Sequence, residues 1–320
     1  MKTQLLVSPS ASGAYFGDVE GVCLAEFSAL LPDVEVTQDQ VGALHFLKAS
    51  LEPEELRQTA RMSFVQGAFE DGGTGLHPLP LDPDFLLPPE LVFGSSYRGK
   101  THPLVTQLAL NLALHYADTG RPATQLLDPM AGMGTTLLWG LRYGLDGWGI
   151  EQDRAAADGL HRHVKRQTKL HRIKHRHAKG FTGAKNRRGE GAFVDYEMGG
   201  HTARLVTGDT VRAETLLERR RFDMIVCDLP YGVQFKGKGQ RVSDLVAECV
   251  PVWVDRLRPG GAMVLIFNTY QPHRNELAHL CTGAGCAVES FAAPHRMSES
   301  IVRDLLVATR PRGGGSPPSG

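Results

Sequence analysis

The sequence predicts an α/β protein in which a mostly parallel, doubly wound sheet follows a smaller α+β domain. After residue 120, short apolar segments typical of strands alternate with segments of helical periodicity. A stretch rich in Pro and Gly at 71–99 separates this part from the residues before it. The 320 residues are enough for about two domains of ~150 residues. With 42% hydrophobic and 22% charged residues, the composition is that of a globular protein with a buried core.

The first part of the chain, residues 1–70, alternates short strand and helix patterns. The expected order is β-α-β-β-α-β, which is typical of a ferredoxin-like domain. Ser50 is expected to cap the second helix. The strands are expected at 4–7, 34–37, 43–48 and 62–69, and the helices at 19–31 and 52–60.

The second part begins with an extended linker at 71–99, in which five prolines disfavour regular structure. A helix is expected at 104–118, with Pro103 in its first turn and Thr101 as its N-cap. The sheet domain spans 100–310, and the tail at 311–320 is of low complexity and expected to be disordered. The sheet domain's strands are expected at 125–127, 148–151, 204–206, 222–227, 262–268, 288–291 and 301–309, and its further helices at 135–143, 154–177, 212–218 and 242–257.

Several classes of protein are disfavoured by the sequence. It has no apolar run long enough for a membrane helix and no signal-peptide pattern at its start. Its five cysteines form no C-x-x-C pair, which argues against a zinc site or a disulfide framework. We therefore expect a cytoplasmic protein with reduced thiols and no metal.

Charge is distributed unevenly, although the net charge is zero. Residues 1–96 contain four Lys and Arg against fourteen acidic residues, whereas 161–189 contain eleven Lys and Arg, five His and no acid. A polyanion would be repelled by the first segment and attracted by the second. This pattern predicts nucleic-acid contact through the basic segment and leaves the acidic region available to a protein partner.

The first motif is DPMAGMGTT at 128–136, which follows a predicted strand and opens a helix. Gly132 and Gly134 allow the backbone to approach a ligand closely at such a turn. A dinucleotide fingerprint is disfavoured because Leu137 occupies the third glycine position, and no Gly-Lys-Ser/Thr follows to make a P-loop. A tight turn without a ligand would explain two glycines alone, but not the leading Asp-Pro and the paired threonines.

Two further polar strand ends follow in chain order. Glu151 ends the next predicted strand, where a carboxylate can accept both hydroxyls of a ribose. Asp209, in Gly-Asp-Thr, follows another strand and is placed to meet an adenine amino group. Asp153 is expected to cap a helix. Each signal is weak alone, and their succession at neighbouring strand ends predicts one ligand site.

The fourth motif, DLPYG at 228–232, ends the apolar strand at 222–227. An exocyclic amine of a nucleobase is a poor nucleophile, because its lone pair is delocalised into the ring. Two acceptors aimed at its N–H bonds favour the geometry of attack, and Asp228 and the Leu229 carbonyl are candidates. Pro230 turns the chain, and Tyr231 offers a ring for stacking a flipped base. An ordinary turn with a packed tyrosine is the alternative.

Together these motifs resemble the class I S-adenosylmethionine-dependent methyltransferases that act on amino groups. YRGKTHP at 97–103, DPMAGMGTT and DLPYG are most similar to the tRNA guanine-N2 methyltransferases that usually carry a THUMP domain. The resemblance covers roughly residues 95–310 and implies a Rossmann-like seven-stranded sheet, preceded by the family's small ferredoxin-like domain. No room for THUMP is found between Glu70 and Tyr97. Adenine-N6 methyltransferases share a nearly identical fourth motif, generally with a second proline where Leu229 stands.

The resemblance implies S-adenosylmethionine as the cofactor and tRNA as the substrate. It places the methionine part against 128–134, the ribose at Glu151 and the adenine at Asp209, with Thr101 and Pro103 closing the methionine end. The catalytic candidates are Asp228, Leu229, Pro230 and Tyr231. The cofactor candidates are Thr101, Pro103, Asp128, Met130, Ala131, Gly132, Gly134, Thr135, Glu151, Gln152, Asp209, Thr210 and Asp228.

The basic run at 161–188 is the candidate RNA contact, with a solvated helical face as the alternative. His171 and His175 lie four residues apart but lack a third ligand, which favours surface histidines over a metal site. The function alternatives are an adenine-N6 methyltransferase on RNA or DNA and a non-catalytic RNA-binding relic. The RNA-binding candidates are Arg172, Lys174, Arg176 and Lys179, with Lys236, Lys238 and Arg241 in a loop after the fourth motif.

Overall fold

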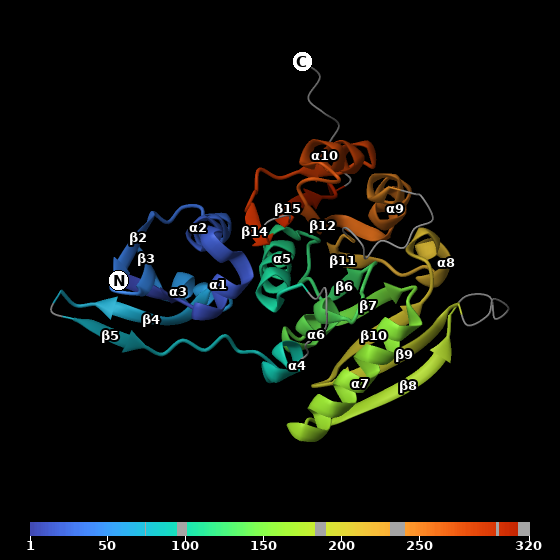
Figure 1. The fold of residues 1–320 in the computed structure, drawn as a ribbon, viewed down its shortest axis with the longest axis horizontal. Coiled ribbons are helices and arrows are strands. Elements are labelled where there is room, and N and C mark those ends of the chain that lie inside the picture. Colours follow the sequence, from blue (N-terminus) through green and yellow to red (C-terminus); the bar gives the residue numbers. More distant parts are fainter. Residues whose placement is uncertain (74, 95–100, 183–189, 231–240, 299–300, 313–320) are drawn as a thin grey trace, which may run out of the picture.

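The computed structural model shows two sheets that lie side by side in one molecule (Figure 1). It describes residues 1–73, 75–94, 101–182, 190–230, 241–298 and 301–312. Most of the sequence at 311–320 therefore lies outside the described residues. Within the described part, no helix combines the length and apolar character needed to cross a membrane. All five cysteines are buried free thiols.

The first sheet has five strands in the order β2-β3-β1-β4-β5, and all its pairs are antiparallel. The predicted β-α-β-β-α-β order of elements is present, with an additional helix and a fifth strand. Glu52 rather than Ser50 caps α3, because its side chain and that of Glu55 form a reciprocal capping box. The elements are β1 (Lys2–Val7), α1 (Pro9–Tyr15), a 3₁₀ turn (Phe16–Asp18), α2 (Val19–Leu30), β2 (Val36–Val41), β3 (Leu44–Ser50), α3 (Pro53–Thr59), β4 (Val65–Asp71) and β5 (Leu76–Leu79).

The stretch at 71–99 is not a structureless linker. It contributes the edge strand β5 and the short helix α4 (Glu90–Phe93). Its backbone is held against the second sheet's helices, since Leu86 N donates to Arg142 O at 2.8 Å and Arg142 Nε donates to Leu87 O at 2.9 Å. The prolines disfavour long elements, but the apolar residues Leu87, Leu91 and Val92 in and after this proline-rich stretch are buried.

Within the described residues, the second sheet has ten strands rather than the seven expected. Its order is β13-β15-β12-β11-β6-β7-β10-β9-β8, with β14 paired to β15. The seven expected strands are present, and the others, β8, β9 and β14, pair antiparallel at or near its edges. The strands are β6 (Gln125–Asp128), β7 (Asp146–Glu151), β8 (His175–Phe181), β9 (Ala192–Met198), β10 (His201–Thr207), β11 (Phe222–Asp228), β12 (Leu257–Asn268), β13 (Ala287–Val288), β14 (His295–Ser298) and β15 (Ile301–Thr309).

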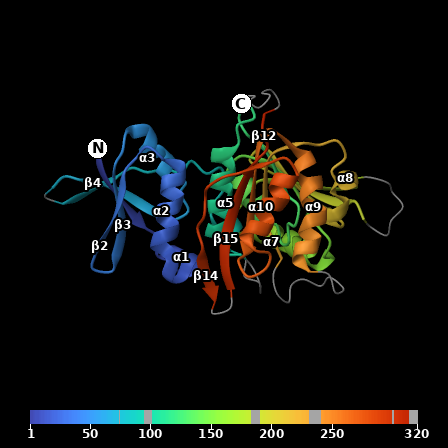
Figure 2. The same cartoon turned by 90° about the horizontal axis from the view of Figure 1, so that it is seen from above.

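Helices cover both faces of this sheet (Figures 1 and 2). Alternate residues of β11 enter separate cores, with Met224 and Val226 on one side and Ile225 and Cys227 on the other. The first core also contains Leu5 and Phe27, so it continues into the N-terminal region. The first face carries α5 (Pro103–Tyr116), α6 (Thr135–Arg142) and α7 (Arg154–Leu170), and the second carries α8 (Ala213–Leu216), α9 (Val242–Arg256) and α10 (Arg274–Gly283).

The predicted helix at 154–177 is wrong in its last seven residues. The helix α7 ends at Leu170, Arg172 adopts a left-handed φ of 52°, and the chain turns into the edge strand β8. The strand β8 pairs with β9 from His175 to Phe181. Both faces of β8 are largely exposed, so it shows no apolar alternation from which a strand could be predicted.

Candidate functional site

Four acidic residues lie at the carboxyl ends of parallel strands in the second sheet, and these ends lie along one side of the sheet, called the sheet edge below. The strands β6, β7, β10 and β11 run parallel, and they lead to Asp128, Glu151, Asp209 and Asp228. The carboxyl ends of parallel strands are where ligands bind in open α/β sheets. The structure therefore brings together the acidic residues of the four sequence motifs.

The glycine-rich turn after β6 is shaped by two left-handed glycines. Gly132 has a φ of 51° and Gly134 a φ of 73°. A Cβ at Gly134 would lie 2.7 Å from Leu160 Cδ2, so this glycine allows the turn to pack on α7. A Cβ at Gly132 would meet nothing within 4 Å and would project into open space. The turn is tied to β7, because Gly132 N donates to Glu151 Oε2 at 2.7 Å and Ala131 N donates to Ile150 O at 2.9 Å.

The carboxyl groups around this turn are withdrawn from water. Asp128 is buried, and desolvation raises its pKa to about 7, although Met130 N donates to Oδ1 at 3.1 Å and Thr136 bonds the same side chain. Burial also raises the pKa of Glu151. Carboxylates held in this way favour a cationic ligand, which would stabilise their charged forms.

Asp228 has its two oxygens in different surroundings. Oδ2 accepts a short hydrogen bond from Thr101 Oγ1 and lies 3.5 Å from Nη2 of Arg303. Oδ1 is buried and accepts no hydrogen bond from any residue within the described ranges. Desolvation raises the pKa of Asp228, and the positive charge of Arg303 opposes this rise.

Thr101 takes part in this cluster instead of capping α5. The N-cap is His102, whose Nδ1 accepts from Leu104 N at 3.3 Å. Pro103 begins the helix as predicted, and its carbonyl accepts a hydrogen bond from Trp139 Nε1 at 2.8 Å. The hydroxyl of Thr101 is thereby directed to Asp228 at the sheet edge.

The remaining candidate residues differ in their burial and in their hydrogen-bond partners. Leu229 is buried, with its N donating to Ile266 O at 2.9 Å, and Pro230 is half-buried. Asp209 caps the turn at Thr210–Arg212, and the Thr210 hydroxyl accepts from Trp253 Nε1 at 3.0 Å, toward α9. Met130 and Thr135 are half-buried in the turn, Gln152 is exposed, and Asp153 caps α7 as predicted. Tyr231, Lys236 and Lys238 lie outside the described residues.

Sequence reasoning missed Arg303. This arginine is fully buried on β15, far along the chain from the motifs, and no local pattern marks it. The available signal was an adjacent Arg–Asp pair within a strand whose other residues are mostly apolar, VRDLLVA. A buried arginine requires an anionic partner, and here one partner is Asp228.

The basic run forms one exposed surface on α7 and β8. Among the described residues, no carboxylate forms a salt bridge with any Lys or Arg between 161 and 182. Arg241, by contrast, is paired with Asp244 at 3.1 Å. The surface contains Arg162, Lys165, Arg166, Lys169, Arg172, Lys174, Arg176 and Lys179, all exposed. We call it the α7–β8 surface.

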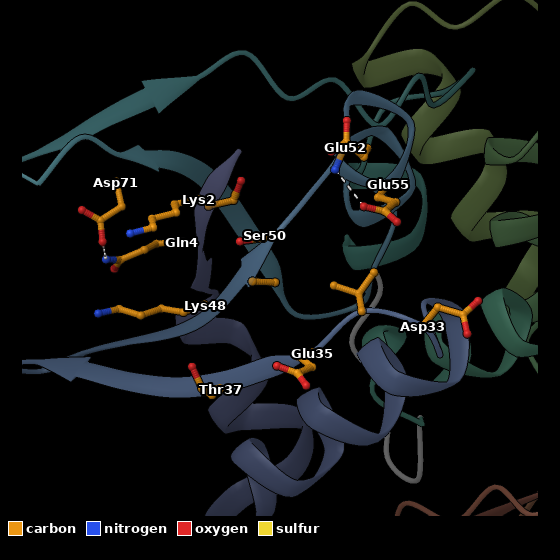
Figure 3. A pocket seen from close by; sticks show the side chains of 13 residues that line it. Lys2, Gln4, Asp33, Glu35, Thr37, Lys48, Ser50, Glu52, Glu55 and Asp71 are labelled. Carbon is orange, nitrogen blue, oxygen red and sulfur yellow. Dashed lines mark hydrogen bonds between the residues drawn. The ribbon is translucent and has the colours of Figure 1, made fainter.

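The N-terminal region carries a separate polar hollow of about 490 Å³ (Figure 3). Lys2 and Lys48 extend to the same side of it as Asp71 (Figure 3), and Gln4 Nε2 donates to Asp71 Oδ2 at 3.1 Å. No residue proposed from the motifs lines it. Within the described residues, no group of three His, Cys, Asp or Glu side chains could hold a metal ion.

Comparison with known families identifies the second part of the chain. The UPF0020 family, described as an RMKL-like methyltransferase domain, matches residues 96–279, which is more than half of the sequence. The chain belongs to this family. The match contains the DPMAGMGTT and DLPYG motifs and ends before β15, so Arg303 lies outside it. No curated protein matches the chain.

Solved methyltransferases are similar in structure to this UPF0020 member. TrmN from Thermus thermophilus aligns with a TM-score of 0.44 and 17% identity, over 87% of this chain and 60% of TrmN. A methyltransferase from Pyrococcus furiosus gives a TM-score of 0.45 and 15% identity, over 69% and 92% of the two chains. The T. thermophilus 16S rRNA N2 G1207 methyltransferase RsmC, solved with AdoMet and guanosine, gives 0.42 and 20%, over 88% and 59%. The chain thus spans less than two thirds of TrmN and RsmC.

Proposed function

We propose that this protein transfers a methyl group from S-adenosylmethionine to the exocyclic amino group of a nucleobase in RNA, with guanine-N2 in tRNA as the substrate. The observation that carries the proposal is the state of Asp228. This carboxylate ends β11 beside the glycine-rich turn, and its Oδ2 is held by Thr101 and Arg303. Its Oδ1 is left as a buried acceptor without a donor among the described residues. Such an acceptor is suited to an N–H donor of the substrate.

The chemistry requires little from the protein beyond positioning. S-adenosylmethionine supplies an electrophilic methyl group on a positively charged sulfur, which leaves as a neutral thioether. Asp228 Oδ1 and the Leu229 carbonyl accept hydrogen bonds from the two N–H groups of the amine, which directs its lone pair at the methyl carbon. The N–C bond then forms as the C–S bond breaks. The proton released by the methylated nitrogen passes to solvent. Placement of the amine by fixed acceptors is the main contribution of these residues.

The cofactor is proposed to lie along the edge formed by β6, β7 and β10. The open space beside Gly132 fits the close approach of a ligand, and the desolvated carboxyl groups of Asp128 and Glu151 fit a positively charged one. The turn at 128–134 would hold the methionine part, Glu151 the ribose hydroxyls and Asp209 the adenine. Oδ1 of Asp209 already accepts from Val211 N at 3.0 Å, so the ligand would use the other oxygen.

RNA is proposed to dock on the α7–β8 surface. The strand β8 pairs antiparallel with β9, which pairs antiparallel with β10, so β8 runs in the same direction as β10 and β7. Its carboxyl end, at Lys179–Phe181, therefore lies on the same side of the sheet as the carboxyl ends of those strands. Phosphates bound along this surface would direct an adjoining nucleotide toward that edge.

The first experiment measures methyl transfer to total RNA and DNA from labelled S-adenosylmethionine, with nucleoside identification by mass spectrometry. Asp228→Ala is expected to lower transfer by ~10²-fold or more, with cofactor affinity within a few-fold of the parent. Asp228→Asn serves as the matched variant, because it retains an oxygen for Thr101 while removing the charge. N2-methylguanosine is the expected product. Near-normal turnover by Asp228→Ala would refute the assignment, and N6-methyladenosine would redirect it to adenine.

The second experiment tests the docking surface. Replacing Arg172, Lys174, Arg176 and Lys179 together with Gln should weaken RNA binding and reduce the slope of log K against log salt by up to ~3 if all four touch single-stranded phosphate. Cofactor affinity should be unchanged. A control with Lys2, Arg57, Arg219 and Arg221 replaced by Gln removes the same charge elsewhere. If both variants bind RNA equally well, the α7–β8 surface is a solvated face.

A further inference from the structure

Arg303 lies at the centre of the contacts that hold the methyl-transfer carboxylate. Its side chain is fully buried. Nη1 donates to Thr101 Oγ1 at 3.0 Å, and Nη2 lies 3.5 Å from Asp228 Oδ2. Since Thr101 Oγ1 itself donates to Asp228 Oδ2, the three side chains form a closed triangle of polar contacts.

The backbone that carries Arg303 is fixed on both sides. In the sheet, Arg303 stands opposite Asn268 of β12 and opposite His295 of β14. The His295 ring is buried and packs edge-on against Tyr15 of the N-terminal region, with ring centroids 5.3 Å apart. Tyr15 is held in turn by a hydrogen bond of 3.2 Å to Leu104 O and a contact of 2.7 Å with Ser63 Oγ. The guanidinium therefore has little freedom to follow a displaced carboxylate.

We propose that Arg303 is a positioning residue for methyl transfer: it keeps Asp228 ionised and occupies its Oδ2 side, so that Oδ1 faces the substrate amine. This inference rests on the proposed function of Asp228. A protonated carboxyl group can present an O–H donor instead of an acceptor, and a rotated carboxylate no longer directs Oδ1 at the amine, which donates hydrogen bonds to these acceptors. Because Arg303 lies outside the matched family range, the inference concerns this chain's own β15.

The other groups near Asp228 do not favour its charged form, so a nearby cation is needed to keep this carboxylate ionised. Asp128 on β6 and Glu151 on β7 are carboxyl groups with raised pKa values, and the negative charge of Asp228 contributes to the raised pKa of Asp128. Cys227 is buried with its pKa raised well above the usual value, and Thr101 is neutral. The pKa of His295 is lowered by burial, so its ring is neutral at physiological pH. Among the charged groups near Asp228 in the described residues, Arg303 is the one that favours the carboxylate.

The test compares the dependence of kcat/KM on pH for the parent, Arg303→Met and Arg303→Lys, together with cofactor affinity and thermal stability. Arg303→Met should lower kcat/KM by ~10²-fold at neutral pH and move the acid limb of the profile up by ~1 pH unit or more, because Asp228 is then protonated more readily. Arg303→Lys retains the charge and should recover most of the shift in the limb. Cofactor affinity should stay within a few-fold in both.

Two outcomes separate this inference from the proposed function. Suppose that Asp228→Ala is inactive, that Arg303→Met keeps the parent's acid limb, and that its loss of activity is no larger than its loss of folded protein. Arg303 then has only a structural role, and the inference is refuted. If Asp228→Ala itself is active, the proposed function fails first. Should Arg303→Met not fold, Arg303→Lys and Thr101→Val carry the test. Thr101→Val removes the hydroxyl from the triangle and should lower kcat, and a normal kcat would contradict the proposed positioning.

Discussion

Glu26 offers a direct test of how the N-terminal region is joined to the methyltransferase part. This side chain is fully buried at the boundary between the two. Its oxygens accept hydrogen bonds from Ser63 N at 2.9 and 3.0 Å, from Ser63 Oγ at 2.6 Å and from Asn111 Nδ2, on α5, at 2.7 Å. Desolvation nevertheless raises the pKa of Glu26 to about 7. Replacing Glu26 with Gln should keep most of these contacts, since its Oε1 can still accept from Ser63 N and Asn111 Nδ2 and the Ser63 hydroxyl can turn to accept from the new amide.

The sign and size of the effect follow from proton linkage. A carboxyl group with a higher pKa in the folded than in the unfolded state stabilises the fold most fully at low pH, and this contribution decreases as the pH rises through the folded value. The pKa of Glu26 is 4.5 for the unfolded chain and about 7 in the folded protein. At about 1.4 kcal/mol per pKa unit, the parent should lose ~2–3 kcal/mol relative to Glu26→Gln between pH 5 and pH 8.

Urea denaturation of the parent and Glu26→Gln at several pH values and constant ionic strength measures this difference. Other titrating groups affect both proteins equally and cancel in the comparison. Glu35→Gln, an exposed carboxylate in the same region, is the matched control and should show no such trend. A difference in unfolding free energy between parent and Glu26→Gln that stays constant from pH 5 to pH 8 would refute the reasoning.

Two further predictions concern the cofactor edge. Gly132→Val should abolish cofactor binding in calorimetry, because its side chain would fill the open space beside the turn. Gly42→Val controls for backbone strain, since Gly42 has a similar φ of 60° and also faces open space, and this variant should bind the cofactor normally. The affinity for the cationic cofactor should fall by up to about tenfold per pH unit as the pH drops below about 7, because Asp128 takes up a proton there, and Asp128→Asn should remove this dependence. Retained binding in the first case, or a dependence that survives Asp128→Asn, would contradict these assignments.

The sequence was informative where local patterns decide structure. Each strand that ends in a motif carries a short apolar run, and such runs bounded by Gly, Pro and Asp are recognisable without tertiary information. The positions of Asp128, Glu151 and Asp228 at one edge then follow from parallel pairing. The candidate site was therefore predictable to the level of which strand ends meet.

Tertiary contacts decide the features that sequence reasoning missed. The segment after Leu170 has helical composition, but pairing with β9 makes it a strand. Thr101 has the residue type of an N-cap, yet Asp228 takes its hydroxyl, and His102 caps the helix instead. Arg303 has no neighbouring motif, because its partners come from residues 75 and 202 positions earlier in the chain. These contacts cross the chain and leave no local pattern.

The distribution of charge over the molecule supports different roles for the N-terminal region and the second sheet. The acidic N-terminal region packs beside α5 and β14, and the α7–β8 surface lies at the opposite end of the second sheet (Figure 1). The hydrophobic core that joins the N-terminal region to α5, and the contact of Tyr15 with His295, make that region part of the framework behind Arg303. If RNA binds as proposed, it would be drawn to the basic end, be repelled from the acidic end and cross the sheet edge between them, where the strand-end carboxylates lie. The N-terminal region would thus contribute to catalysis by bracing the site and excluding phosphate, without gripping the substrate.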